Sequence, residues 1–169
     1  QNGSITVDGK LDASAPTQGD GGFIETSGAQ VKIADSAVIT TLAKNGKTGT
    51  WLVDPQDFTV SASGGDLTGT TLSSQLASNN IELRSAAGLQ SGSGNVNIND
   101  SITWSADRRL TLTASNNVNV NANITANGAG AGLYINPNTA NTNSVTNIIE
   151  AASGSGVFNI TNGVKVSLP

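Results

Sequence analysis

Carboxylate side chains are the residues of this sequence that could carry acid–base chemistry. The candidates lie in its first half: Glu25, Asp35, Asp54, Asp57 and Asp66. Paired acids cleave glycosidic bonds, and other carbohydrate-active sites combine Ca²⁺-bound Asp residues with a Lys or Arg. The segment Asp54-Pro55-Gln56-Asp57 could place two carboxylates at one corner. The simpler interpretation is an Asp-Pro turn in which Asp57 caps local backbone amides.

Other kinds of active site lack the residues that they need. The sequence has no His and no Cys, which removes the commonest general base, the Ser–His and Cys–His pairs and the usual zinc sites. Gly46-Lys47-Thr48 is not preceded by the first Gly of a phosphate-binding loop, and the Gly-rich calcium nonapeptide is absent. Arg108-Arg109, after Asp107, could bind an anionic sugar, but a solvated turn is the simpler interpretation. We therefore predict no enzymatic activity and no catalytic, cofactor-binding or metal-binding residues.

Composition limits the classes of partner. Charged residues make up 12% of the 169 residues, aromatic residues make up 4%, and the formal net charge is -4. The 8 Lys and Arg residues are scattered along the chain, so we predict no binding to nucleic acid. No apolar run approaches the roughly 18 residues of a membrane-spanning helix. A surface rich in Ser, Thr and Asn instead suits a repetitive β-structure.

A repeated segment defines the elements that must position these side chains. Residues 95–104 align with residues 117–126 at a shift of 22 (118 minus 96). At this shift Val96 meets Val118 and Ile98 meets Val120, while the intervening Asn residues also align. Apolar and polar residues alternate with period two, which is typical of β-strands. The alternative is a pair of unrelated Asn-rich hairpins.

Less regular copies fill the rest of the chain. Ile5 aligns with Val31 at a spacing of 26 (31 minus 5), and a polar loop follows each copy, at 16–22 and 44–49. The next strands begin with Phe23 and Trp51, which we predict to be core side chains or stacked neighbouring rings rather than ligand sites. Apolar residues four apart predict a short helix near residues 70–78 after a Ser or Thr N-cap. Further strands are predicted at these ranges: 81–84, 110–113, 133–135, 145–149, 157–160 and 164–168.

Strands that return about every 22 residues predict an all-β parallel β-helix, or solenoid, of about seven coils. Each coil buries its aliphatic row only against its neighbours, so Val stacks on Val and Ile on Ile. Outward Asn side chains form ladders along the axis. We expect one β-helical domain over residues 1–169. Because the chain starts at Gln1 and ends without a cap, we expect it to be a fragment of a longer chain.

Three stretches resemble a known family. They are residues 21–28 (Gly-Gly-Phe-Ile-Glu-Thr-Ser-Gly), residues 51–55 (Trp-Leu-Val-Asp-Pro), and residues 94–99 with 104–106 and 110–112. They are similar to the two-partner-secretion exoproteins, the filamentous-haemagglutinin-like and high-molecular-weight adhesins of Gram-negative bacteria. The family's secretion domain carries an early Asn-Pro-Asn followed by Gly or Leu. Here Asn136-Pro137-Asn138 is late and precedes Thr139, which places this segment downstream of that domain.

The resemblance implies a right-handed β-helix that is secreted through an outer-membrane transporter of the two-partner type. The segment would be part of the shaft of a surface adhesin that attaches to host cells or biofilm partners. Its expected partners are surface glycans or proteins, with self-association through exposed coil edges as a further possibility. The alternatives are a carbohydrate-active β-helix, such as a polysaccharide lyase or glycosidase, and the stalk of a contact-dependent toxin.

Overall fold

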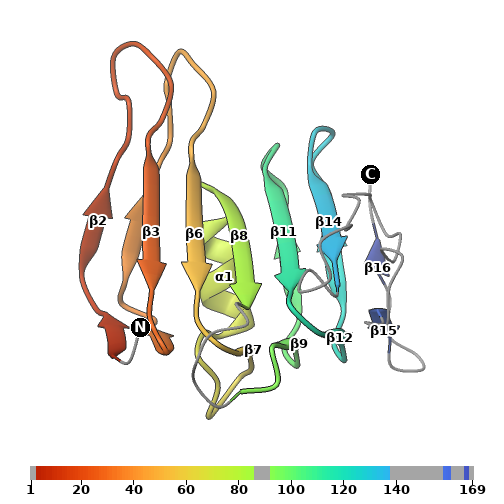
Figure 1. Ribbon diagram of the computed structural model, residues 1–169. Helices are drawn as coiled ribbons and strands as arrows, with labels where there is room; N and C mark the ends of the chain where they lie inside the picture. The colour runs from red at the N-terminus through yellow and green to blue at the C-terminus, as the bar shows by residue number, and fades with distance from the viewer. Residues whose placement is uncertain (1–2, 86–91, 138–157, 161–165, 168–169) are drawn as a thin grey trace.

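A computed structural model describes residues 3–85, 92–137, 158–160 and 166–167 of the chain (Figure 1). Strands stack side by side along one axis, and every paired strand runs parallel to its neighbours. The predicted parallel β-solenoid is therefore confirmed. Each turn visits three faces in the order A, B and C.

Face A holds β1 (Ser4–Val7), β4 (Gln30–Ile33), β7 (Phe58–Val60), β9 (Val96–Ile98), β12 (Val118–Val120) and β15 (Phe158–Ile160). Face B holds β2 (Lys10–Asp12), β5 (Val38–Thr40), β10 (Ile102–Trp104), β13 (Ile124–Ala126) and β16 (Val166–Ser167). Face C is one five-stranded sheet of β3 (Phe23–Ser27), β6 (Thr50–Asp54), β8 (Asn80–Ser85), β11 (Arg109–Ala114) and β14 (Gly132–Asn136). The only helix among these described residues is α1 (Gly69–Gln75).

Within the described residues, the number of turns is lower than the seven expected for the chain. Face C contains five strands, which mark about five turns. Register partners on this face are separated by 27 (50 minus 23), 30 (80 minus 50), 29 (110 minus 81) and 23 (133 minus 110) residues. The 22-residue period therefore holds only near β9 and β12, because loops and the helix lengthen the earlier turns.

The stacking predicted from the repeat is confirmed. Val96 is the register partner of Val118, and Ile98 is the partner of Val120; all four side chains are fully buried. On the outside of the same strands, Nδ2 of Asn119 donates to Oδ1 of Asn97 at 2.8 Å. The aliphatic rows and the amide ladders thus run along the same axis, on opposite sides of one sheet.

The prediction that Phe23 and Trp51 lie in the core is correct for Trp51 and wrong for Phe23. Trp51 is completely buried, and its Nε1–H donates to the hydroxyl of Thr26 at 3.2 Å. Phe23, in contrast, is 60% exposed. Its register partner is Thr50, whereas Ile24 is the partner of Trp51. Because side chains alternate between the two sides of a strand, this one-residue difference turns Phe23 outward.

The predicted loops at 16–22 and 44–49 stack as two neighbouring arms (Figure 1). Each arm is closed at its base by a backbone hydrogen bond, from Gly22 N–H to the Ala13 carbonyl and from Gly49 N–H to the Thr41 carbonyl. A Cβ atom on Gly21 would lie 1.7 Å from the Thr41 carbonyl oxygen. Only glycine allows the two arms to approach this closely.

The short helix was predicted correctly, with slightly different bounds. The Thr68 hydroxyl is the N-cap and accepts from Thr71 N–H at 3.1 Å. The strands at 81–84, 110–113, 133–135 and 157–160 are present, and β16 covers two residues of the strand expected at 164–168. The strand expected at 145–149 lies outside the described residues.

Candidate functional site

Helix α1 occupies the position of the face B strand in the third turn, between β5 and β10. Two amide side chains, one in the helix and one just after it, replace the missing strand. Gln75 accepts from Ile39 N–H through Oε1 (3.2 Å) and donates to the Ala37 carbonyl through Nε2 (2.7 Å). Asn79, just after the helix, donates to the Ile39 carbonyl at 2.9 Å and accepts from the Thr41 hydroxyl at 2.9 Å. The edge of β5 is therefore satisfied by side chains.

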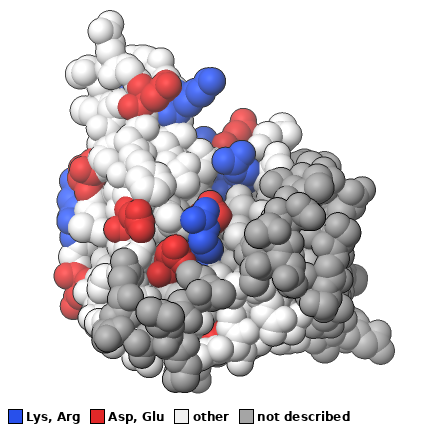
Figure 2. All heavy atoms as spheres, in the orientation of Figure 1, with Lys and Arg blue, Asp and Glu red and all other residues white. Residues whose placement is uncertain are grey.

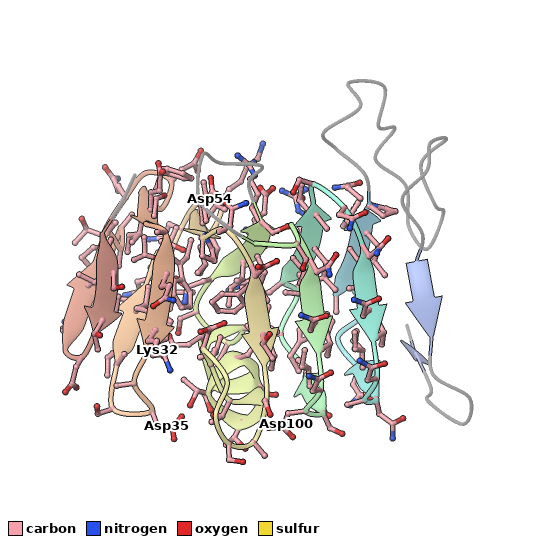
Figure 3. The ribbon with its side chains drawn as sticks, turned by 60° about the horizontal axis from the view of Figure 1, so that its bottom comes forward. Lys32, Asp35, Asp54 and Asp100 are labelled. Atoms are coloured by element: carbon pink, nitrogen blue, oxygen red, sulfur yellow. The ribbon has the colours of Figure 1, made fainter. Side chains whose placement is uncertain are left out.

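Two carboxylates from adjacent turns hold the start of this helix. Asp35, from the second turn, accepts from the hydroxyls of Thr68 (2.8 Å) and Thr71. Asp100, from the fourth turn, accepts from Gly69 N–H through Oδ2 at 2.8 Å. The hydrogen bonds from Thr71 and Thr68 lower the pKa of Asp35. In the view of Figure 3, Asp35 and Asp100 lie on either side of α1.

A groove of about 650 Å³ runs between β5 and α1. Its walls combine the two carboxylates with the hydroxyls of Thr70 and Ser74, and the exposed Val38 adds an apolar side chain. Such walls can hydrogen-bond the hydroxyls of a small polar ligand. Oδ1 of Asp35 accepts both hydroxyl bonds, and these bonds favour the ionised form of the carboxyl group.

A second group of charged side chains lies on face C. It consists of Glu25 on β3, Asp54 on β6, and Glu82 and Arg84 on β8. Arg84 donates to Oε1 of Glu82 through Nε (3.0 Å) and Nη2 (2.8 Å), and Oε1 also accepts from the Thr113 hydroxyl at 2.9 Å. Figure 2, viewed as in Figure 1, shows acidic and basic side chains side by side over this sheet. We call Glu25, Asp54, Glu82 and Arg84 the face C cluster.

Asp54 has the environment of a proton donor. Burial raises its pKa, the Arg84 charge opposes this shift, and the charges of Glu25 and Glu82 add to it. Among the described residues, Oδ1 of Asp54 has no hydrogen-bond partner. A half-buried carboxyl group with a raised pKa is the kind of group that serves as a general acid, so Asp54 is the candidate for that role in the cluster.

The remaining sequence candidates have structural roles. Asp57 accepts from Asn95 N–H through Oδ1 and from Ser93 N–H through Oδ2, both at 2.9 Å. Asp57 therefore caps backbone amides, but these belong to the next turn, so the prediction that it caps local amides is wrong. Asp66 accepts from Thr59 N–H at 2.9 Å, and burial is the main cause of its raised pKa.

The arginine pair lies at the junction between a turn and a strand: the half-buried Arg108 precedes β11, and the exposed Arg109 is its first residue. The predicted solvated turn is therefore only partly correct. The guanidinium of Arg109 lies 5.2 Å from the ring centroid of Tyr134, and Nη1 of Arg108 donates to the Asp107 carbonyl at 2.9 Å. Arg109 therefore contacts an aromatic ring of the next turn, and Arg108 contacts the backbone of the preceding residue. Neither belongs to the face C cluster.

Sequence reasoning missed the partners that complete both sites. Glu82 and Arg84 are two residues apart on one strand, which places them on the same face and could have identified the ion pair. Gln75 and Asn79 are four apart, so they share one side of a helix. The sequence shows no sign that this side faces the edge of β5.

Comparisons with known proteins give no identity. No protein-family model, curated protein or solved structure matches the chain. Within the described ranges, no helix is long and apolar enough to cross a membrane. In the same ranges, the acidic residues form no group that could hold a metal ion.

Proposed function

We propose that this chain is a section of the β-solenoid shaft of a large secreted bacterial surface adhesin. The observation that carries the proposal is the in-register stack of the core. Leu110, for example, pairs with Ile81 on one side and Leu133 on the other, and these side chains are at most 1% exposed. A stack of this kind transmits load from turn to turn through backbone bonds and packed side chains.

The hydrogen bonds of the carboxylates support this function. Asp35 and Asp100 anchor a helix, and Asp57 caps the following turn. These groups connect neighbouring turns and so contribute to a rigid rod. Surface loops and the groove beside α1 remain available for contact, because substitutions there leave the core unchanged.

The likeness of residues 21–28 and 51–55 to two-partner-secretion adhesins gives the proposal its biological setting. In this setting the chain crosses the outer membrane unfolded through a dedicated transporter and folds outside a Gram-negative cell. The absence of Cys is compatible with such a route. The partners are then glycans or proteins of host cells or of neighbouring bacteria.

An attachment assay tests the proposal. Beads coated with the folded chain should adhere to epithelial cells or bacterial lawns, and the chain should bind glycan arrays without releasing reducing ends. Beads coated with a Val120→Asp variant, whose core is disrupted, serve as the matched control. Adhesion that is equal for both proteins, or absent for both, would contradict a role for the folded surface.

The face C cluster favours a second candidate, cleavage of a polysaccharide. Glu25 and Glu82 both pair with Leu52, from opposite sides, so their Cα atoms are roughly 9.6 Å apart, or two strand spacings. The two carboxyl groups therefore lie on one face of the sheet, with Asp54 on the strand between them, and paired acids are the groups that cleave glycosidic bonds. Release of reducing ends that is lost in both Asp54→Asn and Glu82→Gln would establish this candidate and overturn the shaft as the sole function.

A further inference from the structure

The peptide bond between Asp54 and Pro55 lies where the chain leaves face C at the end of the second turn (Figure 3). Of the 4 Pro residues in the sequence, only Pro55 follows an Asp. An Asp–Pro bond is labile in acid for two reasons. The proline nitrogen is a basic leaving group, and the Asp carboxyl group can close a five-membered ring on the carbonyl carbon of its own residue.

The neighbours of the Asp54 side chain leave one of its oxygens without a partner. Its register partner on β3 is Ser27, whose hydroxyl donates to Glu25 instead. On the other side, Arg84 of β8 donates both of its short bonds to Glu82. Among the described residues, the buried Oδ1 of Asp54 therefore accepts no hydrogen bond. This oxygen is free to react with the main chain of its own residue.

The surroundings of Asp54 also favour the protonated form of its carboxyl group. Burial is the main cause of the raised pKa of Asp54, and the Arg84 charge opposes it. The charges of Glu25 on β3 and Glu82 on β8 add to the rise. A protonated carboxyl group supplies both an attacking oxygen and the proton that the leaving nitrogen needs.

A backbone amide is placed where charge develops during such an attack. Gly28 N–H donates to the carbonyl oxygen of Asp54 at 3.3 Å. This oxygen becomes negative when the carboxyl oxygen adds to the carbonyl carbon. The donor directly follows β3, which pairs with β6 along its whole length, so it is held in place before the reaction starts.

We propose that the folded chain cleaves itself between Asp54 and Pro55. One carboxyl oxygen of Asp54 attacks the carbonyl carbon of the same residue. The bond from this carbon to the Pro55 nitrogen breaks, and the carboxyl proton moves to the nitrogen. Asp54 is left as a five-membered cyclic anhydride, which one water molecule opens to two carboxyl groups. The products are residues 1–54 and a second chain that begins with the free secondary amine of Pro55.

The place of the bond gives its cleavage a structural consequence. In the described part of the chain, the second and third turns share a strand ladder only on face C, between β6 and β8. On face A, β7 does not pair with β4, and on face B the helix α1 replaces the strand. Cleavage therefore removes the covalent link at a junction with few ladders and gives the shaft a break point. This inference goes beyond the proposed function, because adhesion needs no cleavage.

The experiment is incubation of the full chain at about pH 5, which lies above the ordinary Asp pKa of about 3.9. Circular dichroism verifies that the chain stays folded, and samples are denatured before mass spectrometry so that fragments held by the face C ladder separate. We expect fragments 1–54 and 55–169 to form about tenfold faster than in urea at the same pH, a factor below the roughly 10²–10³ of a well-placed oxyanion donor because the Gly28 bond is long.

Three variants separate this reaction from general lability. Asp54→Asn keeps the shape of the side chain but has no acid proton, and Pro55→Ala keeps the acid but makes the leaving nitrogen less basic. Whichever of the two folds like the wild-type chain should stay intact over the same period. Arg84→Gln removes the charge that opposes the raised pKa of Asp54, so its cleavage should extend to higher pH and give the same fragments.

The inference is overturned by an intact wild-type chain, by equal rates in the folded and urea-unfolded chains, or by an Arg84→Gln profile that does not move to higher pH. An intact chain that still adheres to cells would reject self-cleavage and leave the proposed function standing. Cleavage of a chain that does not adhere would reject the adhesin function alone.

Discussion

Replacing Gln75 by Leu tests whether a side-chain amide substitutes for a strand. The buried Gln75 bonds the Ile39 N–H and the Ala37 carbonyl. Leu is of similar size, so it fills the same space but leaves both backbone groups without partners. Each unsatisfied buried group costs about 1–3 kcal/mol, so the free energy of unfolding should fall by about 2–6 kcal/mol. That is a large fraction of the roughly 5–15 kcal/mol of a typical domain.

The measurement is urea unfolding followed by circular dichroism. Thr70→Leu is the control, because Thr70 is exposed on the same helix, and such surface changes shift stability by about 0.5 kcal/mol or less. A Gln75→Leu variant as stable as Thr70→Leu would refute the role of the amide.

Gln75→Glu gives the same interaction a dependence on pH. The ionised side chain can accept from Ile39 but cannot donate to the Ala37 carbonyl, whereas the protonated form can do both. Burial beside a carbonyl therefore raises the pKa of the new carboxyl group in the folded state. Its stabilising contribution is complete below the unfolded pKa of about 4.3 and is lost as the pH rises through the higher folded pKa. A pH profile identical to that of the wild-type chain would contradict this expectation.

Further predictions concern the core, an amide ladder and two carboxylates, all measured by chemical unfolding. Val120→Asp places an unpaired charge in a fully buried row and should destabilise by about 4 kcal/mol or more. Asn119→Asp removes the donor to Asn97 on the outer side of the sheet and should cost about 1 kcal/mol at neutral pH. Equal losses in the two variants would contradict the inside and outside assignment. Hydrogen bonds lower the pKa of Asp35 in the folded state. Its stabilising contribution is therefore present above the unfolded pKa and is lost as the pH falls through the folded pKa. The free energy of unfolding of Asp35→Asn should accordingly fall less in acid than that of the wild-type chain. Burial raises the pKa of Asp54 in the folded state, so Asp54→Asn should raise the free energy of unfolding at neutral pH. This gain in stability should disappear below the unfolded pKa. A loss of stability at neutral pH would show that the ionised group has a stabilising partner.

The register of the later turns could be read from sequence because one face of each strand is buried. Alternation of Val96, Ile98 and their neighbours allows only even shifts, and the aligned Asn rows select 22 among them. The position of Phe23 could not be read in the same way. It directly follows Gly22 at the base of its arm, whereas Thr50 separates Gly49 from Trp51. Since Thr50 N–H donates to the Gly22 carbonyl, the arms set a register that places Phe23 opposite Thr50.

The sequence predicts that a helix forms near residues 70–78, but it does not predict which strand this helix contacts. Apolar spacing around Leu72 and Leu76 identifies a helix, and both side chains are fully buried. Gln75 and Asn79 carry no comparable signal, because polar residues on a short helix usually face solvent. The two amides bind the backbone groups at the edge of β5, and this edge lies next to them only after the turns have stacked.

The interruption of face B explains how a rigid rod can carry a variable surface. Across the third turn the face C ladder continues from β6 through β8 to β11. On face A, β7 pairs with β9 of the fourth turn but not with β4 of the second. Stability in a solenoid comes from contacts between neighbouring turns, so the face C ladder keeps the third turn in register with the second while α1 replaces a strand. The groove beside α1 therefore lies where the rod depends least on strand pairing. For a shaft that also binds, exposed positions such as Thr70 and Ser74 are those at which substitutions can change a contact surface at the smallest cost to the fold.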